Sequence, residues 1–349
     1  MLEQSMSPIT STTAEQLLHD LVAIPSPSRE EASASRFLAD WMGQQGYDEA
    51  YVDEAGNAVG IIGNGEREIV LLGHIDTFPG FPEVRVDGRT LYGRGSVDAK
   101  GPLCTFAVAA RQAQLSDNVR VVVIGAVEEE AATSKGARYA ATQYSPDLCV
   151  IGEPSNWERI TLGYKGRLLL DWRWEGGLSH SAGEALSPAE IAINYWLNVK
   201  AYADEFNKDI TSLYASLDAS VRDINTRQEG VNGIAEMTVA FRLPPNITPQ
   251  EIVAQFPPTD GATVSPRGGE VAFAGDKNSE LSRLFRRAIR DNEGNPRFLY
   301  KTGTADMNVV GPIWDCPIAA SGPGDSSLDH NPHEHIDLDE YLRAISVLT

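Results

Sequence analysis

The amino-acid sequence predicts a mixed α/β fold in which an α+β segment is inserted into a larger domain. Short apolar runs alternate with amphipathic helical segments, and this alternation is typical of a sheet that helices cover on both faces. Between residues 165 and 274 the order becomes strand, helix, strand, strand, helix, strand, which is the ferredoxin-like plan. We therefore expect a discontinuous first domain, residues 1–164 and 275–349, and an inserted second domain, residues 165–274.

Apolar periodicity and its punctuation define the elements of the first domain. A helix over residues 14–21 should stop at the prolines Pro25 and Pro27. Ser28 and Glu31 have the spacing of a capping box, so a second helix should begin there. A further helix is expected at 103–114 and a last one from Leu338. β-branched runs between Gly, Asn and Asp predict strands at 51–53, 58–62, 68–72, 119–127 and 148–151.

The inserted domain is expected to begin with a strand at 167–174 and to continue with a helix at 188–206. Its remaining expected elements are strands at 219–224 and 234–243, a helix at 249–256 and a strand at 262–265. After it, a basic helix at 281–290 and strands near Phe298 and Ile318 return to the first domain.

The charge balance excludes several classes of partner. With Lys+Arg 29 against Asp+Glu 49 the formal charge is −20, and such a surface repels nucleic acid and anionic membranes. The apolar run from Leu103 to Ala110 is far shorter than the roughly 20 residues of a membrane span. Residues 1–13 lack the order of a signal peptide, so we expect a cytoplasmic protein.

Acidic and imidazole side chains follow the ends of predicted strands. His74 and Asp76 stand at positions i and i+2, which share one face of a strand. Three carboxylates, residues 128–130, follow the strand at 119–127, and Glu153 follows the strand at 148–151. Adjacent carboxylates beside a buried strand repel one another unless a cation or solvent relieves them. A capped strand and a solvated charge run are the alternative explanations.

Two further motifs point to the same chemistry. Asp98 stands in a glycine-rich turn where a dinucleotide loop would need a glycine, so this loop favours a cation over a phosphate. An aspartate that caps the following helix is the alternative. His330 follows Gly322-Pro323-Gly324-Asp325. Ligands of open α/β sheets bind beyond the carboxyl ends of the strands, and a mixed His, Asp and Glu set favours zinc.

The ordered motifs GHIDT, GRGSVDAKG, EEE, IGEP and GPGD…H resemble those of di-zinc metallopeptidases. That family includes succinyl-diaminopimelate desuccinylase, acetylornithine deacetylase, carboxypeptidase G and aminoacylase. The resemblance covers the chain nearly end to end. It implies a mixed-sheet zinc-peptidase catalytic domain, an inserted ferredoxin-like lid and dimerisation domain, a homodimer, and two Zn²⁺ ions, for which Co²⁺ could substitute.

The resemblance also implies roles for individual residues. Five of them would be metal ligands, with the aspartate bridging the two ions: His74, Asp98, Glu130, Glu153 and His330. Three would act in catalysis: Asp76 by orienting His74, Glu129 as general base, and His180 by reaching the oxyanion across the dimer. The peptide bond Asp98-Ala99 would be cis.

One departure from the family leaves an alternative open. The family usually has two acidic residues where this chain has three, so the base and ligand could instead be Glu128 and Glu129. We prefer Glu129 and Glu130 because Glu128 then takes the position that is often Asp in relatives. Neighbouring residues on an extended chain point opposite ways, so one can bind metal while the other faces the substrate water.

The segments at 163–167 and 301–308 most resemble the branch that releases lysine or ornithine. That branch cleaves lysine from the γ-carboxyl of a small amino-group carrier protein, or removes an acetyl group from the α-amine. Arg242, Lys301 and Asn232 are the candidate substrate-binding residues; ordinary surface charge is the alternative for Arg242 and Lys301. The carriers of this branch are themselves acidic, so docking one would need a basic rim, which we expect around Lys165 and Arg167.

Other functions remain as alternatives at this point. An N-acetyl-lysine or N-acetylornithine deacetylase, a succinyl-diaminopimelate desuccinylase and a dipeptidase would use the same metal site on a small N-acyl amino acid or a dipeptide. A metal-binding paralogue without catalysis would be expected to lose the base or the orienting carboxylate. Asp76 and Glu129 are both present, which argues against such a paralogue.

Overall fold

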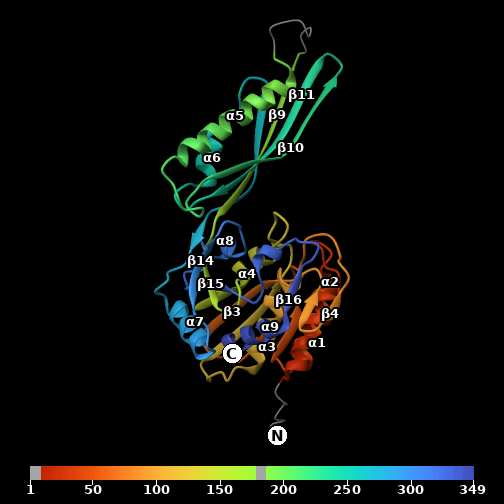
Figure 1. Ribbon diagram of the computed structural model, residues 1–349, viewed down its shortest axis with the longest axis vertical. Helices are drawn as coiled ribbons and strands as arrows, with labels where there is room; N and C mark the ends of the chain where they lie inside the picture. The colour runs from red at the N-terminus through yellow and green to blue at the C-terminus, as the bar shows by residue number, and fades with distance from the viewer. Residues whose placement is uncertain (1–8, 178–185) are drawn as a thin grey trace. The chain divides into compact units, whose positions relative to one another are not determined.

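The computed structural model describes residues 9–177 and 186–349, which form two compact units (Figure 1). The first unit contains the chain up to Gly163 together with Gly275–Leu299 and Val309–Thr349. The second unit contains Tyr164–Ala274 and also the short segment Tyr300–Asn308. The C-terminal part of the chain thus contributes to both units.

A mixed sheet forms the centre of the first unit. Its strand order is β1-β2-β6-β3-β7-β15-β8, and β3 runs parallel to both β6 and β7. β15 is parallel to β7, whereas β2 is antiparallel to β6. The strands of this order are β1 (Glu49–Val52), β2 (Ala58–Ile62), β3 (Arg67–His74), β6 (Val119–Ala126), β7 (Leu148–Gly152), β8 (Arg159–Tyr164) and β15 (Ile318–Ser321).

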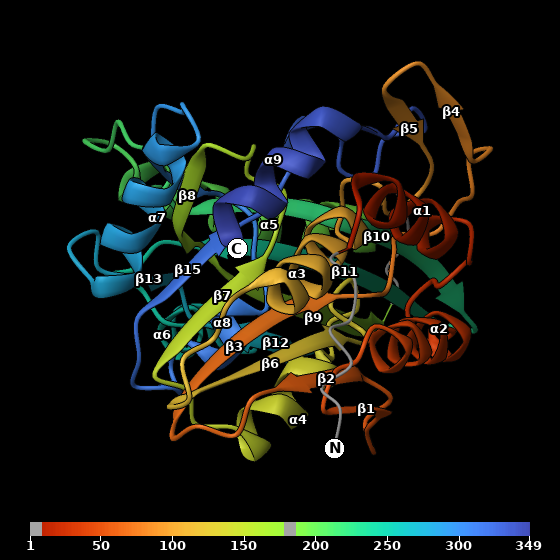
Figure 2. The ribbon, with the colours of Figure 1, turned by 90° about the horizontal axis from the view of Figure 1, so that it is seen from below.

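Helices pack on this sheet as an inner layer, α3, and an outer layer that contains α1 and α9. α3 packs on β3 and β6, and α1 and α9 pack on α3 (Figure 2). α3 is buried almost all round because it lies between the sheet and these helices, which explains its unbroken apolar run. The helices of the unit are α1 (Ser11–Val22), α2 (Ala32–Gln44), α3 (Lys100–Gln112), α4 (Lys135–Gln143), α7 (Glu280–Asp291) and α9 (Leu338–Leu348).

Several short elements have no clear sequence signal. β4 (Arg85–Asp87), β5 (Thr90–Tyr92) and β16 (His335–Asp337) pair as a small separate sheet, and three residues are too few to show a period. α4 was also not predicted. β13 (Phe273–Ala274), β14 (Arg297–Lys301), α8 (Met307–Val310) and a 3₁₀ turn at Ser326–Leu328 complete the described elements outside the inserted sheet.

The predicted capping box at the start of α2 is wrong. The residue that precedes α2 is Glu31, and its side chain makes no cap hydrogen bond. Ser28 instead donates its hydroxyl to Asp76 Oδ2 at 2.7 Å, and Glu31 Oε1 accepts from the amides of Arg29 and Glu128. A capping hydroxyl must stand at the N-cap to accept an N–H of the first turn, and because Glu31 holds that position, Ser28 lies outside the helix, where its hydroxyl makes a charge-assisted bond to Asp76.

The second unit is a four-stranded antiparallel sheet with order β12-β9-β11-β10. In chain order this is the 4-1-3-2 arrangement of the ferredoxin-like plan. Its elements are β9 (Gly166–Gly177), α5 (Pro188–Phe206), β10 (Asp218–Glu229), β11 (Asn232–Leu243), α6 (Pro249–Gln255) and β12 (Ala262–Glu270).

The two helices of this unit begin at clear signals. Ser187 with Glu190 and Thr248 with Glu251 form capping boxes, each followed by a proline in the first turn. The helices pack on the face of the sheet that carries Leu168, Leu170 and Trp172. The alternate residues of β9, which include Arg167 and Leu169, therefore face away from the helices.

None of the helices in the described part of the chain combines the length and the apolar character needed to cross a bilayer.

Candidate active site

Asp98 lies between two imidazoles of the first unit. Its Oδ1 is 3.3 Å from His74 Nε2, and its Oδ2 is 3.4 Å from His330 Nε2. The peptide bond from Asp98 to Ala99 is cis, as the family resemblance implied. One carboxylate thus offers each of its oxygens to a different histidine, which is the arrangement that a bridging ligand requires.

The His330 side of the site contains Glu130. His330 Nε2 is 3.0 Å from both Glu130 carboxylate oxygens. Ligand atoms of Asp98, Glu130 and His330 all lie within 4.8 Å of one another. His330 is 44% exposed and its ring stacks on Phe78 at a centroid distance of 4.3 Å, so this side of the site is accessible from solvent.

The His74 side is buried. His74 Nδ1 lies 3.0 Å from the carbonyl oxygen of Asp76, and donation to it would leave Nε2 unprotonated. Nε2 is buried, has no hydrogen-bond partner among the described residues, and lies 4.0 Å from Glu153 Oε1. A buried imidazole nitrogen that faces two carboxylates without a hydrogen bond fits a metal ligand.

Asp76 supports both sides of the site through its carboxylate. Oδ1 accepts the backbone N–H of Glu129 and Oδ2 that of Glu130, each at 3.0 Å. Oδ2 also accepts the Ser28 hydroxyl, and Oδ1 lies 3.4 Å from His74 Nδ1. This fully buried carboxylate therefore fixes the start of the acidic loop relative to His74.

Glu128 and Glu130, two of the three adjacent glutamates, meet different partners. Glu128 adopts φ 61, its Oε2 accepts the Thr133 hydroxyl, and the same atom lies 3.9 Å from Arg29 Nε. Glu130 meets His330. Burial alone would lower the pKa of His74, but Asp76 and Asp98, followed by the Glu129 carboxylate, raise it. The assignment of Glu129 and Glu130 as the base and ligand pair stays a prediction.

The pKa shifts of the site residues show that its carboxylates stabilise positive charge placed among them. Asp98 and Glu130 raise the pKa of His330 to about 10. Burial alone would raise the pKa of Asp98, but the two imidazoles outweigh it and hold that pKa well below its usual range. Burial is the main cause of the raised pKa of Glu130. Because a metal ligand must be a neutral imidazole, divalent ions would take the place of these protons.

A buried ion pair beneath the site was not predicted from the sequence. Arg94 Nη1 donates to Glu334 Oε2 at 2.6 Å, and Glu334 Oε1 accepts the backbone N–H groups of Val97 and Asp98 at 2.9 and 3.1 Å. Both side chains are almost fully buried. The arginine inside the glycine-rich turn was the available signal, because a buried guanidinium needs a counter-charge from elsewhere in the chain.

The candidate substrate-binding residues all belong to the second unit. Arg242, at the end of β11, donates to the Thr304 hydroxyl at 2.7 Å, and Thr304 donates to the Lys165 carbonyl oxygen. Lys301 Nζ lies 5.8 Å from the centroid of the Tyr164 ring. The two segments that resemble the lysine-releasing branch, 163–167 and 301–308, therefore lie side by side with Arg242.

Asn232 does not join this group, and one predicted residue is not described. Asn232 begins β11 and donates to Glu175 Oε1, so the length of the strand, about 33 Å, separates it from Arg242. His180 lies outside the described residues. The expectation of a basic rim at Lys165 is wrong, because Lys165 is fully buried and its ammonium donates to Asp218 Oδ2 at 2.6 Å.

The fold and this donor set define a metallopeptidase. Residues 70–349 match peptidase family M20/M25/M40, and the chain belongs to that family of hydrolases. Metallopeptidases of the family depend on a metal, typically zinc.

Individual relatives cover nearly the whole chain. The chain is 46% identical over 345 residues to the "[LysW]-lysine hydrolase" of Deinococcus radiodurans. The aligned residues cover 96% of this chain and 95% of the relative. It is 27% identical to a "[LysW]-lysine/[LysW]-ornithine hydrolase" of Saccharolobus islandicus, with 97% and 94% covered. The fold is similar to a solved M20 family metallo-carboxypeptidase from Sulfolobus solfataricus, with a TM-score of 0.76, 18% identity, and 96% and 97% covered.

Proposed function

We propose that this protein is a di-zinc hydrolase that releases lysine, or ornithine, from the γ-glutamyl C-terminus of an amino-group carrier protein in lysine or arginine biosynthesis. The observation that carries the proposal is the 46% identity, over nearly the full length of both chains, to a protein named for hydrolysis of LysW-linked lysine. We further propose that it acts in the cytoplasm as a homodimer.

The donor set supports two metal positions that share Asp98. His74 and Glu153 would complete one position, and Glu130 and His330 the other. The orphaned Nε2 of His74 is the observation that supports the buried position. When bound, two zinc ions would supply Lewis-acid polarisation of the scissile carbonyl and lower the pKa of the attacking water.

Side chains of the protein would transfer the protons and hold the reacting groups in position. Glu129 is proposed as the general base that takes a proton from the attacking water and passes it to the departing amine. Asp76 would hold Glu129 in place through the backbone N–H, and would fix the tautomer of His74. His180 is proposed as the oxyanion donor.

Recognition of the amino acid is proposed to involve the second unit. The Arg242 guanidinium and the Lys301 ammonium are suited to bind the α-carboxylate of the released residue. Asn232, at the far end of β11, would need to serve a different part of the substrate or a site in the partner protomer of the dimer.

A side-by-side assay tests the proposal. The zinc-loaded enzyme should release lysine from the lysine-charged carrier much faster than it cleaves N-acetylornithine or N-succinyl-diaminopimelate, and metal analysis should find two zinc ions per chain. Rapid cleavage of either small substrate with the charged carrier left intact would reassign the enzyme as a deacetylase or desuccinylase of the same family.

A further inference from the structure

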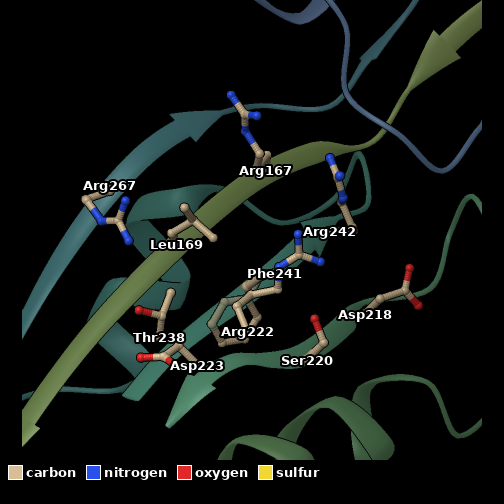
Figure 3. Close-up of a pocket in the computed structure, with 11 residues that line it drawn as sticks. Arg167, Leu169, Asp218, Ser220, Arg222, Asp223, Thr238, Phe241, Arg242 and Arg267 are labelled. Atoms are coloured by element: carbon tan, nitrogen blue, oxygen red, sulfur yellow. The ribbon is translucent and has the colours of Figure 1, made fainter. Parts of the chain in front are cut away.

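The open face of the sheet in the second unit carries a hollow of about 380 Å³ that is lined by four arginines (Figure 3). Each arginine comes from a different strand: Arg167 from β9, Arg222 from β10, Arg242 from β11 and Arg267 from β12. Arg167 and Arg242 are cross-strand partners in the register of β9 and β11. A chain with formal charge −20 thus gathers four of its 29 basic residues at one place.

Backbone irregularities accompany two of these arginines. A β-bulge between Val221 and Asp223 leaves Arg222 without a partner in the register of β11. A second bulge, between Gly268 and Glu270, follows Arg267 on the opposite edge strand. Bulges turn a side chain away from the regular pleat, so both edge strands depart from ideal geometry at this hollow.

Nearby carboxylates offset part of the charge of two of these arginines, and a third carboxylate has a cation outside the hollow. Asp171 accepts hydrogen bonds from Arg267, Glu270 lies 3.5 Å from Arg167, and Asp218 accepts from Lys165. Asp223 is the further acidic residue of the lining. The Arg222 guanidinium makes no hydrogen bond or ion pair with a described residue, and it is exposed.

We propose that this hollow, lined by Arg167, Arg222 and Arg267 around Leu169, is a docking surface for an acidic polypeptide segment of the substrate protein. The inference rests on the proposed function, because only a protein-borne substrate needs a contact beyond the scissile bond. Guanidinium groups spread over three strands suit several carboxylates along a chain, each bound by a charge-assisted hydrogen bond. Nucleic acid is disfavoured by the charge of the rest of the molecule.

The charge contrast also has a kinetic consequence. An acidic partner is repelled by most of this surface and attracted at the hollow, so the approach is directed to one face. The contribution should be strongest at low ionic strength and should fall as salt screens it.

The variant Arg222→Glu tests the proposal, because it removes no hydrogen bond or ion pair to a described residue. We expect kcat/KM for the lysine-charged carrier to fall about tenfold, mainly through KM, relative to kcat/KM for a small γ-glutamyl-lysine substrate. The matched control is Arg287→Glu on α7, an arginine that is 83% exposed and lies in the other unit. It should leave the ratio of the two constants unchanged.

A direct binding measurement separates this inference from the proposed function. A hexaglutamate peptide should bind the wild-type enzyme in low salt, should bind Arg222→Glu more weakly, and should inhibit cleavage of the carrier but not of the small substrate. If the enzyme fails to cleave the charged carrier while the peptide still binds at the hollow, the proposed function is wrong, but the hollow remains a binding surface for acidic polypeptides.

The opposite outcome overturns the inference alone. If the carrier is cleaved, and neither Arg222→Glu nor added salt changes its KM relative to the small substrate, the hollow is not the docking surface. Should Arg222→Glu fold poorly, the salt dependence of the wild-type KM and the milder Arg222→Gln give the same decision.

Discussion

The two units each gather side chains of one charge, but they relieve the repulsion in different ways. In the first unit Asp98 and Glu153 are buried, Glu129 and Glu130 are half-buried, and the cations that meet Asp98 and Glu130 are imidazoles. In the second unit Arg222 and Arg267 are exposed, and Arg267 has a carboxylate of its own. The buried acidic cluster is therefore suited to bound cations, whereas solvent and neighbouring carboxylates offset only part of the charge of the exposed arginines in the hollow.

This difference predicts unequal costs when a charge is removed. A buried charge that loses its partner costs several kcal/mol, but an exposed ion pair contributes about 0 to 1 kcal/mol. Substitutions in the acidic cluster should therefore change chemistry, metal content and stability together. Substitutions in the arginine hollow should change recognition and leave the fold intact.

The largest effect is expected at the base. Glu129→Gln keeps the shape of the side chain but removes its proton-accepting charge, so kcat should fall by about 10²- to 10⁴-fold. Zinc content, measured by mass spectrometry of the dialysed protein, should stay at the wild-type value. Glu128→Gln is the matched control, because Glu128 contacts Thr133 and Arg29, and it should keep most of the activity. The reverse result would move the base to Glu128.

A smaller effect is expected when the support of the cluster is removed. In Asp76→Asn one oxygen becomes an N–H donor that faces the backbone N–H of Glu129 or Glu130. Zinc affinity should fall about 10- to 100-fold, as for other residues that orient a metal ligand. Competition with a chelating dye would measure it.

Asp48→Asn provides the comparison for Asp76→Asn. Asp48 also accepts a backbone N–H, from Gly63 at 2.7 Å. Gly63 follows β2, which is antiparallel to β6, so this contact lies at the opposite end of the sheet from the acidic cluster. Equal zinc affinities in the two variants would show that Asp76 does not position the ligands.

A third effect concerns Ser28, whose hydroxyl reaches the buried Asp76 carboxylate. Ser28→Ala should lower the free energy of unfolding by about 1.5 to 3 kcal/mol, because the lost hydrogen bond involves a charged group. It should also weaken zinc binding. Ser26→Ala removes a 2.8 Å bond to the neutral carbonyl of Ile75 and should cost about 1 kcal/mol with no change in zinc affinity. Urea unfolding and the dye competition distinguish the two variants.

Sequence patterns predicted much of this molecule because its signals are local. The apolar periodicity located the long helices, and the inserted sheet follows the expected order because its strands and capped helices are long. The grouping of the proposed metal ligands could also be predicted, since the carboxyl ends of neighbouring parallel strands meet at one edge. His74 and Asp98 are 24 positions apart in the sequence, yet each follows from its own local motif.

Features that depend on distant partners could not be predicted. Ser28 and Glu31 fit a local capping box, but Ser28 binds a carboxylate 48 residues away. The Arg94–Glu334 pair joins residues 240 positions apart. Lys165 was expected at a rim, and only the packed structure shows that it is buried against Asp218. Four arginines from four strands become one hollow only when the strand order is known.

The smallest effects are expected in the arginine hollow. Arg267→Ala removes an exposed pair with Asp171, which should cost about 0.2 to 1 kcal/mol near neutral pH. Arg267 lowers the pKa of Asp171 below its ordinary value of 3.8. The pair therefore stabilises the fold above that pH, and its contribution is lost as the pH falls through the lowered pKa of Asp171. Unfolding curves of the variant and the wild type should converge in that acidic range.

Arg222→Ala should change the free energy of unfolding by no more than about 0.5 kcal/mol at any pH, because its guanidinium has no described partner to lose. A clear destabilisation would mean that Arg222 serves the fold, and the contrast between the two clusters would then disappear. If the free energy of unfolding is unchanged and the acidic peptide binds more weakly, Arg222 serves recognition of a partner and not the stability of the fold.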